Sequence, residues 1–362
     1  MKYFLLGYLL LSGLRPVLSA DEISSRPSVV MEKAVTRGIE FLISQQQTNG
    51  AIVNAPPPNQ SNAHALTGLS IMAMTAAGHR PTDDTPAGHA LRKALDYILD
   101  PKRQSTSKEN PGYYGDGDDS RMYGHGIVTL MLAEMVGMGV DARQDEVIRD
   151  RCQKAIDLIV RSQKVKKNET FKGGWRYHPT AIDADLSVTV WQVMALRAAK
   201  NAGLTVPKES IDAAVAYIKR SYYSKRDPTG RILDLKSAFA YQPGGGPSYS
   251  TAAEGLLALQ VCGEYDAPEL KGTVEWLRLN KLKNSSVGYF YYGTYYFAQG
   301  MYQQGGSVAD EARHLVENLL LAEQKENGRW QSQEGSGSPV YGTAMAILSL
   351  SVRHHFMPIY QR

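Results

Sequence analysis

The sequence predicts an all-α protein in which twelve helices pair into six hairpins and the hairpins close into a ring. Two kinds of helix pattern alternate along the chain six times. The first and last hairpins are as apolar as the middle ones, whereas the terminal repeats of an open solenoid usually carry polar caps. The open solenoid is the alternative architecture, and no strand-rich segment is recognisable.

The first kind of helix is amphipathic and carries charges. Its apolar residues recur at three- and four-residue spacing on one face, which is typical of a helix with one side in water. We expect these helices to form the outer layer of the ring. They cover residues 31–47, 89–99, 147–163, 209–223, 268–280 and 307–324.

The second kind of helix is small, apolar and almost free of charge. A helix that is apolar on nearly all sides is buried on nearly all sides, so these helices should line the centre. Most of them end in glycine, which suits the left-handed position after a helix. They cover residues 62–78, 122–139, 186–203, 249–263, 291–306 and 340–354.

A loop signal recurs where outer helices end. A glutamine closes the helix, a glycine follows in the turn, and a tryptophan comes after it in two of three cases. The glutamine can hold the end of its helix while the indole packs over the turn. The sets are Gln324, Gly328 and Trp330; Gln163, Gly174 and Trp175; and Gln46 with Gly50.

The composition is that of a soluble globular protein of 362 residues, with 43% hydrophobic and 21% charged residues. Residues 1–20 resemble a secretion signal, because Lys2 precedes a short apolar run and "VLSA" ends at Ala20. Residues 21–30 would be a linker and 31–362 the helical domain. We expect export to the periplasm or cell envelope.

Charge and cysteine content limit the partners. Without Lys2 and Arg15 the formal charge falls from +4 to 4 − 2 = +2, which is too small to indicate nucleic-acid binding. Cys152 and Cys262 lie in apolar helical patterns and are expected to be free thiols. No metal or cofactor is expected. Peripheral contact with a membrane and the oligomeric state stay open.

The glutamine-to-tryptophan repeats resemble those of the terpenoid cyclase and protein prenyltransferase superfamily. The resemblance covers about Met31 to Phe356. The strings "GGWRYHP" and "DADLSVTVWQVMALRAAKNAGLTVP" are similar to exported bacterial proteins with prenyltransferase/squalene-oxidase repeats. This resemblance implies an α/α toroid. It also implies, for a cyclase, protonation of a linear isoprenoid by an Asp-x-Asp-Asp motif at the start of an inner helix.

Two stretches match that motif. In "IDADLS", Asp183 and Asp185 fill its first and third positions immediately before a helix, so the resemblance implies that Asp185 is the acid. Leu186 replaces the fourth residue of the motif, which weakens the proton relay. The alternative is that Asp185 caps the helix. We expect Asp183 and Asp185 to lie close to the second stretch, because all inner helices should begin on one rim.

The second stretch, "GDGDDS", matches the motif in full with Asp116, Asp118 and Asp119, but it lies further from its helix. It equally resembles the start of a calcium loop or a solvated turn. His125 lies in the first turn of the helix that follows, where it could share a proton with these aspartates. A zinc prenyltransferase is disfavoured, because Cys262 has no aspartate two residues before it.

Tyrosine is used 21 times and phenylalanine 7 times. Since buried hydroxyls need partners, tyrosine suits a half-wet cavity better than a purely structural core. Hydrogen bonding between helices is the alternative explanation. Candidate ligand-binding residues are Trp175, Tyr177, Trp191, Tyr123, Tyr292, Tyr295, Tyr296 and Gln299.

Three functional classes follow. The first is a class II terpene-cyclase-like isomerase or lyase with a small hydrophobic or isoprenoid ligand. The second is a non-catalytic toroid that binds a ligand or protein in the cell envelope. The third is a secreted polysaccharide lyase or glycoside hydrolase. A deep pocket containing the aspartates would favour an enzyme, and a filled or shallow centre would favour the binding toroid.

The export signal gives a first prediction. The protein isolated from its native host should begin near Asp21, because the small-residue end of the signal precedes it. Intact-mass measurement and N-terminal sequencing check this. A protein that still begins at Met1 and stays in the cytoplasm would contradict both the signal and the assignment to the cell envelope.

Overall fold

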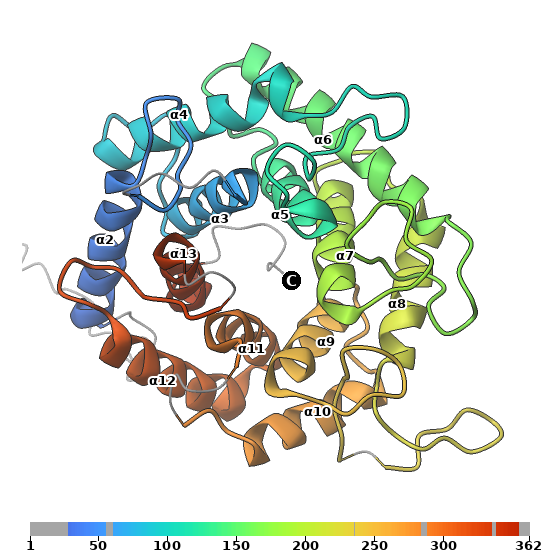
Figure 1. The fold of residues 1–362 in the computed structure, drawn as a ribbon. Helices are drawn as coiled ribbons and strands as arrows, with labels where there is room; N and C mark the ends of the chain where they lie inside the picture. The colour runs from blue at the N-terminus through green and yellow to red at the C-terminus, as the bar shows by residue number, and fades with distance from the viewer. Residues whose placement is uncertain (1–27, 56–60, 235, 284–287, 335–337, 355–362) are drawn as a thin grey trace, which may run out of the picture.

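The computed structural model describes residues 28–55, 61–234, 236–283, 288–334 and 338–354. Within them the chain forms a closed α/α toroid with an inner and an outer ring of helices (Figure 1). The inner helices are α3 (Ala63–Ala76), α5 (Arg121–Glu134), α7 (Leu186–Asn201), α9 (Tyr249–Val261), α11 (Phe290–Gln304) and α13 (Pro339–Leu350). The outer helices are α2 (Val29–Ser44), α4 (Pro86–Leu99), α6 (Ala142–Gln163), α8 (Lys208–Arg220), α10 (Pro268–Leu279) and α12 (Gly306–Glu323). The 3₁₀ turns η1 (Pro101–Arg103) and η2 (Val352–His354) complete the list of elements.

The predicted division between inner and outer helices is confirmed by burial. Every residue of α3 and of α9 is buried. By contrast, α4 buries one face and leaves the other in water, as its amphipathic pattern predicts. In the described residues, β-structure is limited to isolated bridges such as Trp175 with Asp185. No described helix is long and apolar enough to cross a membrane.

Four glutamines join neighbouring hairpins in the same way. Each donates two hydrogen bonds from its side-chain nitrogen, one to a glycine carbonyl in its own loop and one to a carbonyl of the next outer helix. The pairs of acceptors are Gly50 and Ala90 for Gln46, Gly112 and Arg151 for Gln104, Gly173 and Ser210 for Gln163, and Gly328 and Ala34 for Gln324. Gln104 was not part of the predicted loop signal. Gln163 donates to the carbonyl of Gly173, whereas the predicted signal contained Gly174.

Gln324 closes the ring. Its side-chain nitrogen lies 2.8 Å from the carbonyl oxygen of Ala34 in α2 and 2.9 Å from that of Gly328. Arg37 of α2 donates to the side-chain oxygen of the same glutamine. The sixth hairpin is therefore hydrogen-bonded to the first, and α13 packs against α3 in the inner ring. A closed ring is confirmed and an open solenoid is excluded.

Residues 1–27 lie outside the described residues, so the export signal and most of the predicted linker stay predictions.

The expected buried thiol is found at Cys152, which is free, and burial raises its pKa to about 12. Cys262 is free and half-buried. Both indole nitrogens of the repeat tryptophans donate to outer-helix carbonyls, Trp175 to Ile159 and Trp330 to Leu320.

The ring closure gives a prediction with a matched pair of glycines. Gly328 and Gly263 both have positive φ, 84° and 87°, so alanine is strained at either position. A Cβ at Gly328 would lie 2.3 Å from the carbonyl oxygen of Arg37, whereas a Cβ at Gly263 would meet nothing within 4 Å. Gly263→Ala should therefore cost about 1–2 kcal/mol of unfolding free energy. Gly328→Ala should lower the unfolding free energy by distinctly more, because it adds a clash with the Arg37 carbonyl to the same backbone strain.

Urea unfolding followed by circular dichroism measures both variants. Equal destabilisation of the two would show that the close approach of the last loop to α2 contributes nothing beyond backbone strain. A larger effect at Gly328 would show that the contact between the last and first hairpins supports the whole ring.

Candidate active site in the central cavity

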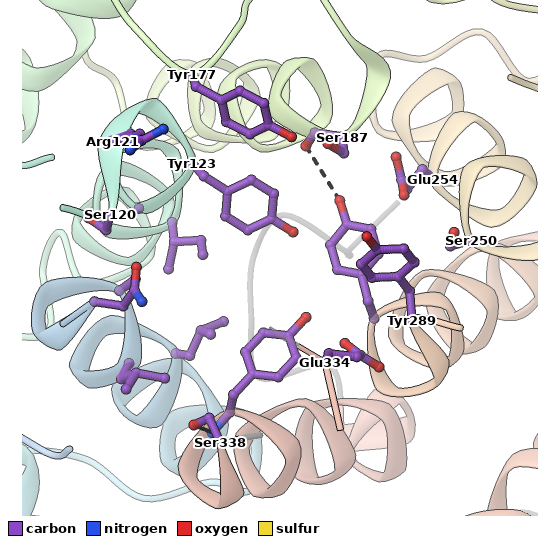
Figure 2. Close-up of a pocket in the computed structure, with 18 of the residues that line it drawn as sticks. Ser120, Arg121, Tyr123, Tyr177, Ser187, Ser250, Glu254, Tyr289, Glu334 and Ser338 are labelled. Atoms are coloured by element: carbon purple, nitrogen blue, oxygen red, sulfur yellow. Dashed lines mark hydrogen bonds between the residues drawn. The ribbon is translucent and has the colours of Figure 1, made fainter. Parts of the chain in front are cut away.

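A cavity of about 1050 Å³ opens in the centre of the ring (Figure 2). Its helical lining residues all come from the first two turns of the inner helices, from Ala65 in α3 to Tyr341 in α13. The cavity therefore opens at the rim where the inner helices begin. Seven of its lining residues are tyrosines: Tyr123, Tyr177, Tyr241, Tyr249, Tyr289, Tyr292 and Tyr341.

Aromatic packing forms part of the floor of the cavity. Trp191 of α7 stacks on Tyr295 of α11, with ring centroids 6.0 Å apart and an angle of 7° between the planes. Tyr296 packs edge-on against the same indole at 5.8 Å. All three side chains are fully buried, because they lie deeper in the ring than the cavity-lining residues of their helices. Among the described residues, these three rings thus lie beneath the cavity on the side of α7 and α11.

Three of the eight predicted ligand-binding residues line the cavity: Tyr123, Tyr177 and Tyr292. Trp191, Tyr295 and Tyr296 lie beneath it, and the expectation that they line it is corrected. Trp175 and Gln299 are also buried outside the lining. In the case of Trp175, the indole is held by Ile159 of α6, as described above.

Two carboxyl groups that the sequence analysis missed line the cavity, and the first is Glu254. It lies in the second turn of α9, it is 1% exposed, and its Oε2 atom has no hydrogen-bond partner. Burial raises the pKa of Glu254 well above its usual value, and the negative charge of Asp185 raises it further. A hydrogen bond with Tyr292 opposes this shift. Burial of Glu254 therefore favours its protonated form.

The second carboxyl is Glu334, in the loop between α12 and α13. The backbone N–H of Tyr291, at the start of α11, donates to its Oε1 atom at 2.7 Å. Burial raises the pKa of Glu334, while hydrogen bonds from the Tyr291 and Tyr292 backbone and from the Tyr341 hydroxyl lower it. A helix N-terminus also favours negative charge. Glu334 is thus the better ionised of the two groups.

Asp185 does not line the cavity. It caps α7, since its Oδ1 atom accepts from the N–H of Val188 and the hydroxyl of Ser187, both at 2.8 Å. Its Oδ2 atom accepts from Arg176 at 2.6 Å. Burial raises the pKa of Asp185, and these hydrogen bonds oppose the rise. The motif match implied that Asp185 is the acid. In the structure, Asp185 instead caps the start of α7.

Asp183 is turned toward the same arginine. Its Oδ2 atom lies 3.3 Å from Nε of Arg176, and its side chain is 41% exposed. The carboxylates of the second stretch form a separate network. Asp118 accepts from the N–H of His64 at 2.6 Å and from Ser120, so it fixes the start of α3. Both stretches lie on the rim where the inner helices begin, but they do not form one shared carboxylate cluster.

The remaining residues of the second stretch are accounted for. Asp119 lines the cavity mouth and pairs with Arg121 at 3.1 Å, with 78% of its side chain exposed. Asp116 is exposed. Among the described residues, no group of three or more histidine, cysteine or acidic side chains is placed to hold a metal ion.

His125 is a structural residue in this arrangement. It is fully buried, its Nε2 atom lies 3.1 Å from the carbonyl oxygen of Ala155 in α6, and it does not line the cavity. Burial lowers its pKa to about 3, so the ring is neutral. The prediction that it shares a proton with the rim aspartates does not agree with this position, because its ring joins α5 to α6.

A signal for Glu254 was present in the sequence. It is the single charged residue of its inner helix, "YSTAAEGLLALQV". An isolated carboxyl in a fully buried helix must be paired, protonated or facing a cavity. Glu334 and Tyr241 come from loops without such a pattern, and only the folded ring brings them to the centre.

The ring is similar to solved structures of proteins named for action on sugars. An inactive variant of an α-1,6-mannanase from Salegentibacter sp., in complex with α-1,6-mannotriose, has a TM-score of 0.59 and 9% identity over 90% of this chain and 99% of that chain. A GH76 α-mannanase from Bacteroides thetaiotaomicron gives 0.56 and 10% over 90% and 96%. A D-mannose isomerase gives 0.58 and 13% over 91% and 100%.

No protein-family model matches the chain, and no curated protein matches it. At identities of 9–13% the likeness to the solved structures establishes the fold, an α/α toroid, and not the reaction. The two named activities, hydrolysis and isomerisation, already differ within this fold. The cyclase assignment that the sequence resemblance implied gains no support from these neighbours.

The buried state of Glu254 gives a stability prediction. A carboxyl whose pKa is raised by folding binds its proton more tightly in the folded state, so the unfolding free energy falls as pH rises from about 4.5 toward the raised pKa. Glutamine does not titrate. Glu254→Gln should therefore equal the wild type near pH 4 and be the more stable of the two at pH 8.

Thermal melts of the wild type, Glu254→Gln and the exposed-residue control Glu146→Gln at the two pH values measure this difference. The control should follow the wild type at both pH values. A Glu254→Gln protein that is less stable than the wild type at pH 8 would show that the carboxylate is stabilised, and not strained, in the folded state.

Proposed function

We propose that this protein binds a neutral saccharide in its central cavity and hydrolyses a glycosidic bond. The observation that carries the proposal is the pair Glu254 and Glu334, two carboxyls that face one tyrosine-lined cavity from different segments and whose surroundings separate their proton affinities. The fold is compatible with it, since the α/α toroids with similar structures include mannanases. The predicted export signal agrees with a glycan substrate outside the cytoplasm.

The reaction follows from the two environments. Protonated Glu254 donates its proton to the glycosidic oxygen as the bond from that oxygen to the anomeric carbon breaks. Glu334 accepts a proton from a water molecule, whose oxygen bonds to the anomeric carbon. Proton exchange with solvent then restores the acid form of Glu254 and the ionised form of Glu334. Both carboxyls lie on the same side of the cavity as Tyr289 (Figure 2).

The charge of the cavity favours a neutral substrate. Its charged lining residues within the described chain are Glu254, Glu334, Asp119 and Arg121, and the arginine is already paired with Asp119 at the mouth. An acidic glycan would therefore meet net negative charge without a free cation to offset it. The hydroxyls and amides around the mouth can instead bind the hydroxyl groups of neutral sugars.

Hydrolysis of a panel of polysaccharides tests the proposal. We expect the release of reducing ends from at least one neutral polysaccharide among α-mannan, β-glucan and xylan, and none from the acidic polysaccharides pectin and alginate. Glu254→Gln and Glu334→Gln should each lower kcat by about 10²–10⁴-fold while the protein stays folded. The exposed-residue variant Glu146→Gln should keep the wild-type rate.

Two outcomes would contradict the proposal. If no neutral polysaccharide is cleaved but squalene is cyclised, the cavity serves isoprenoid chemistry. If sugars bind without any turnover, the protein is a binding toroid and the two glutamates are not catalytic.

The pH dependence of kcat/KM follows from the two pKa shifts. Glu334 must be ionised, so the rate falls as pH drops through its raised pKa, at a higher pH than for an ordinary glutamate. Glu254 must be protonated, so the rate falls again as pH rises through its own raised pKa. Asp185→Asn removes a charge that raises the pKa of Glu254, and should move the alkaline limb to lower pH. An unchanged alkaline limb would contradict the assignment of Glu254 as the acid.

A further inference from the structure

We propose that Tyr177 and Tyr241 form a second sugar-binding subsite at the mouth of the cavity, held in place from behind by Arg176. The inference rests on the proposed function and extends it, because it makes the ligand an oligosaccharide of at least two units. One unit lies at the level of Glu254 and Glu334 and the next lies against the tyrosine pair.

The two tyrosines come from different loops and meet at the mouth. Tyr177 follows α6 and Tyr241 precedes α9, and both line the cavity. Their hydroxyl oxygens are 2.9 Å apart. The backbone carbonyl of Tyr241 accepts from the N–H of Leu186 at 2.8 Å, which fixes its loop to the start of α7. Figure 2 shows Tyr177 pointing into the cavity on the side away from Glu334.

Arg176 fixes both rings from outside the cavity. Its Nη1 atom donates to the hydroxyl of Tyr241 at 2.7 Å, and its guanidinium carbon lies 4.8 Å from the centre of the Tyr177 ring and 5.6 Å from that of Tyr241. Arg176 is not among the lining residues. Its charge is met by Asp185 at 2.6 Å and Asp183 at 3.3 Å, so the subsite offers no cation for an acidic sugar.

The count of donors leaves one hydroxyl hydrogen for a ligand. An arginine can only donate, so the hydroxyl oxygen of Tyr241 is an acceptor. Of the two tyrosine hydroxyl hydrogens, one is used between the rings. The other belongs to Tyr177 or Tyr241, according to which of them donates to its neighbour, and both tyrosines line the cavity. A sugar hydroxyl or ring oxygen is the acceptor that fits this donor.

The rings supply the other half of a sugar-binding site. A pyranose has an apolar face of C–H groups that packs on an aromatic ring, and its hydroxyls bond at the edge. Tyr241 is 38% exposed and Tyr177 is half-buried, so aromatic surface is available at the mouth. Rings already fixed by Arg176 lose little freedom on binding, which increases affinity.

Calorimetry with matched neutral sugars tests the subsite. The probes are mannose with α-1,6-mannobiose, glucose with cellobiose, and xylose with xylobiose, titrated into the wild type and into Glu254→Gln to prevent cleavage. We expect at least one disaccharide to bind about tenfold more tightly than its monosaccharide. Tyr177→Ala and Tyr241→Ala should remove that gain and leave the monosaccharide affinity unchanged. The double variant Tyr177→Phe/Tyr241→Phe should lose about fivefold, because it leaves no hydroxyl hydrogen for the ligand.

Tyr223→Ala is the control, because Tyr223 is 52% exposed and does not line the cavity. It should bind all probes like the wild type. If no disaccharide binds more tightly than its monosaccharide, or if the gain survives in Tyr177→Ala, the subsite does not exist. If a disaccharide binds more tightly than its monosaccharide but no glycosidic bond is hydrolysed, the subsite stands and the proposed reaction is wrong. If a polysaccharide is hydrolysed but no disaccharide binds more tightly than its monosaccharide, the reaction stands and the subsite is wrong.

Asp185→Asn tests the positioning role of the arginine. The amide still accepts from Val188, so the cap of α7 is largely kept, but the ion pair with Arg176 is lost. We expect KM for the disaccharide substrate to rise about fivefold or more, with monosaccharide affinity unchanged. A lower melting temperature with no change in KM would show that Asp185 acts on stability alone and that Arg176 does not hold the mouth tyrosines.

Discussion

The hydrogen bonds of the repeated glutamines are the constraint on which the rest of the structure depends. One amide nitrogen bonds to the glycine carbonyl of its own loop and to a carbonyl of the next outer helix, at four of the junctions around the ring. The glycine carbonyl lies in the loop and is paired by this bond, so the loop can turn tightly without leaving that backbone group unpaired. The helix carbonyl accepts the glutamine in addition to the N–H of its own helix. At Gln324 the same contact joins the last hairpin to the first and makes the ring closed.

Closure determines where the chemistry lies. Because every inner helix begins on the same rim, six helix N-termini surround one opening, and the residues of their first two turns line the cavity. Carboxylates at the helix starts are drawn to backbone N–H groups: Asp185 caps α7 and Asp118 fixes the start of α3. Glu254 lies one turn further in, beyond reach of such donors, and its carboxyl faces the cavity with a raised pKa.

The rim and the cavity are connected through Arg176. Asp185 binds this arginine, the arginine orders Tyr177 and Tyr241 at the mouth, and the charge of Asp185 raises the pKa of Glu254. Under the proposed function, Asp185 does not touch the ligand but affects both how the sugar is held and how readily Glu254 gives up its proton. The stability of the helix start and the function of the cavity depend on the same carboxylate.

The sequence by itself determined the ring, because the periodicity of apolar residues separates inner from outer helices and the glutamine and glycine spacing marks the turns. It also identified Tyr123, Tyr177 and Tyr292 as cavity residues. Only the tertiary structure decided which carboxyls face the cavity. A helix such as α9 is buried on all sides, so its pattern does not tell which side carries Glu254 into the opening. The protonation of a carboxyl depends on its burial and on neighbouring side chains from other hairpins. A local sequence pattern contains no information about either.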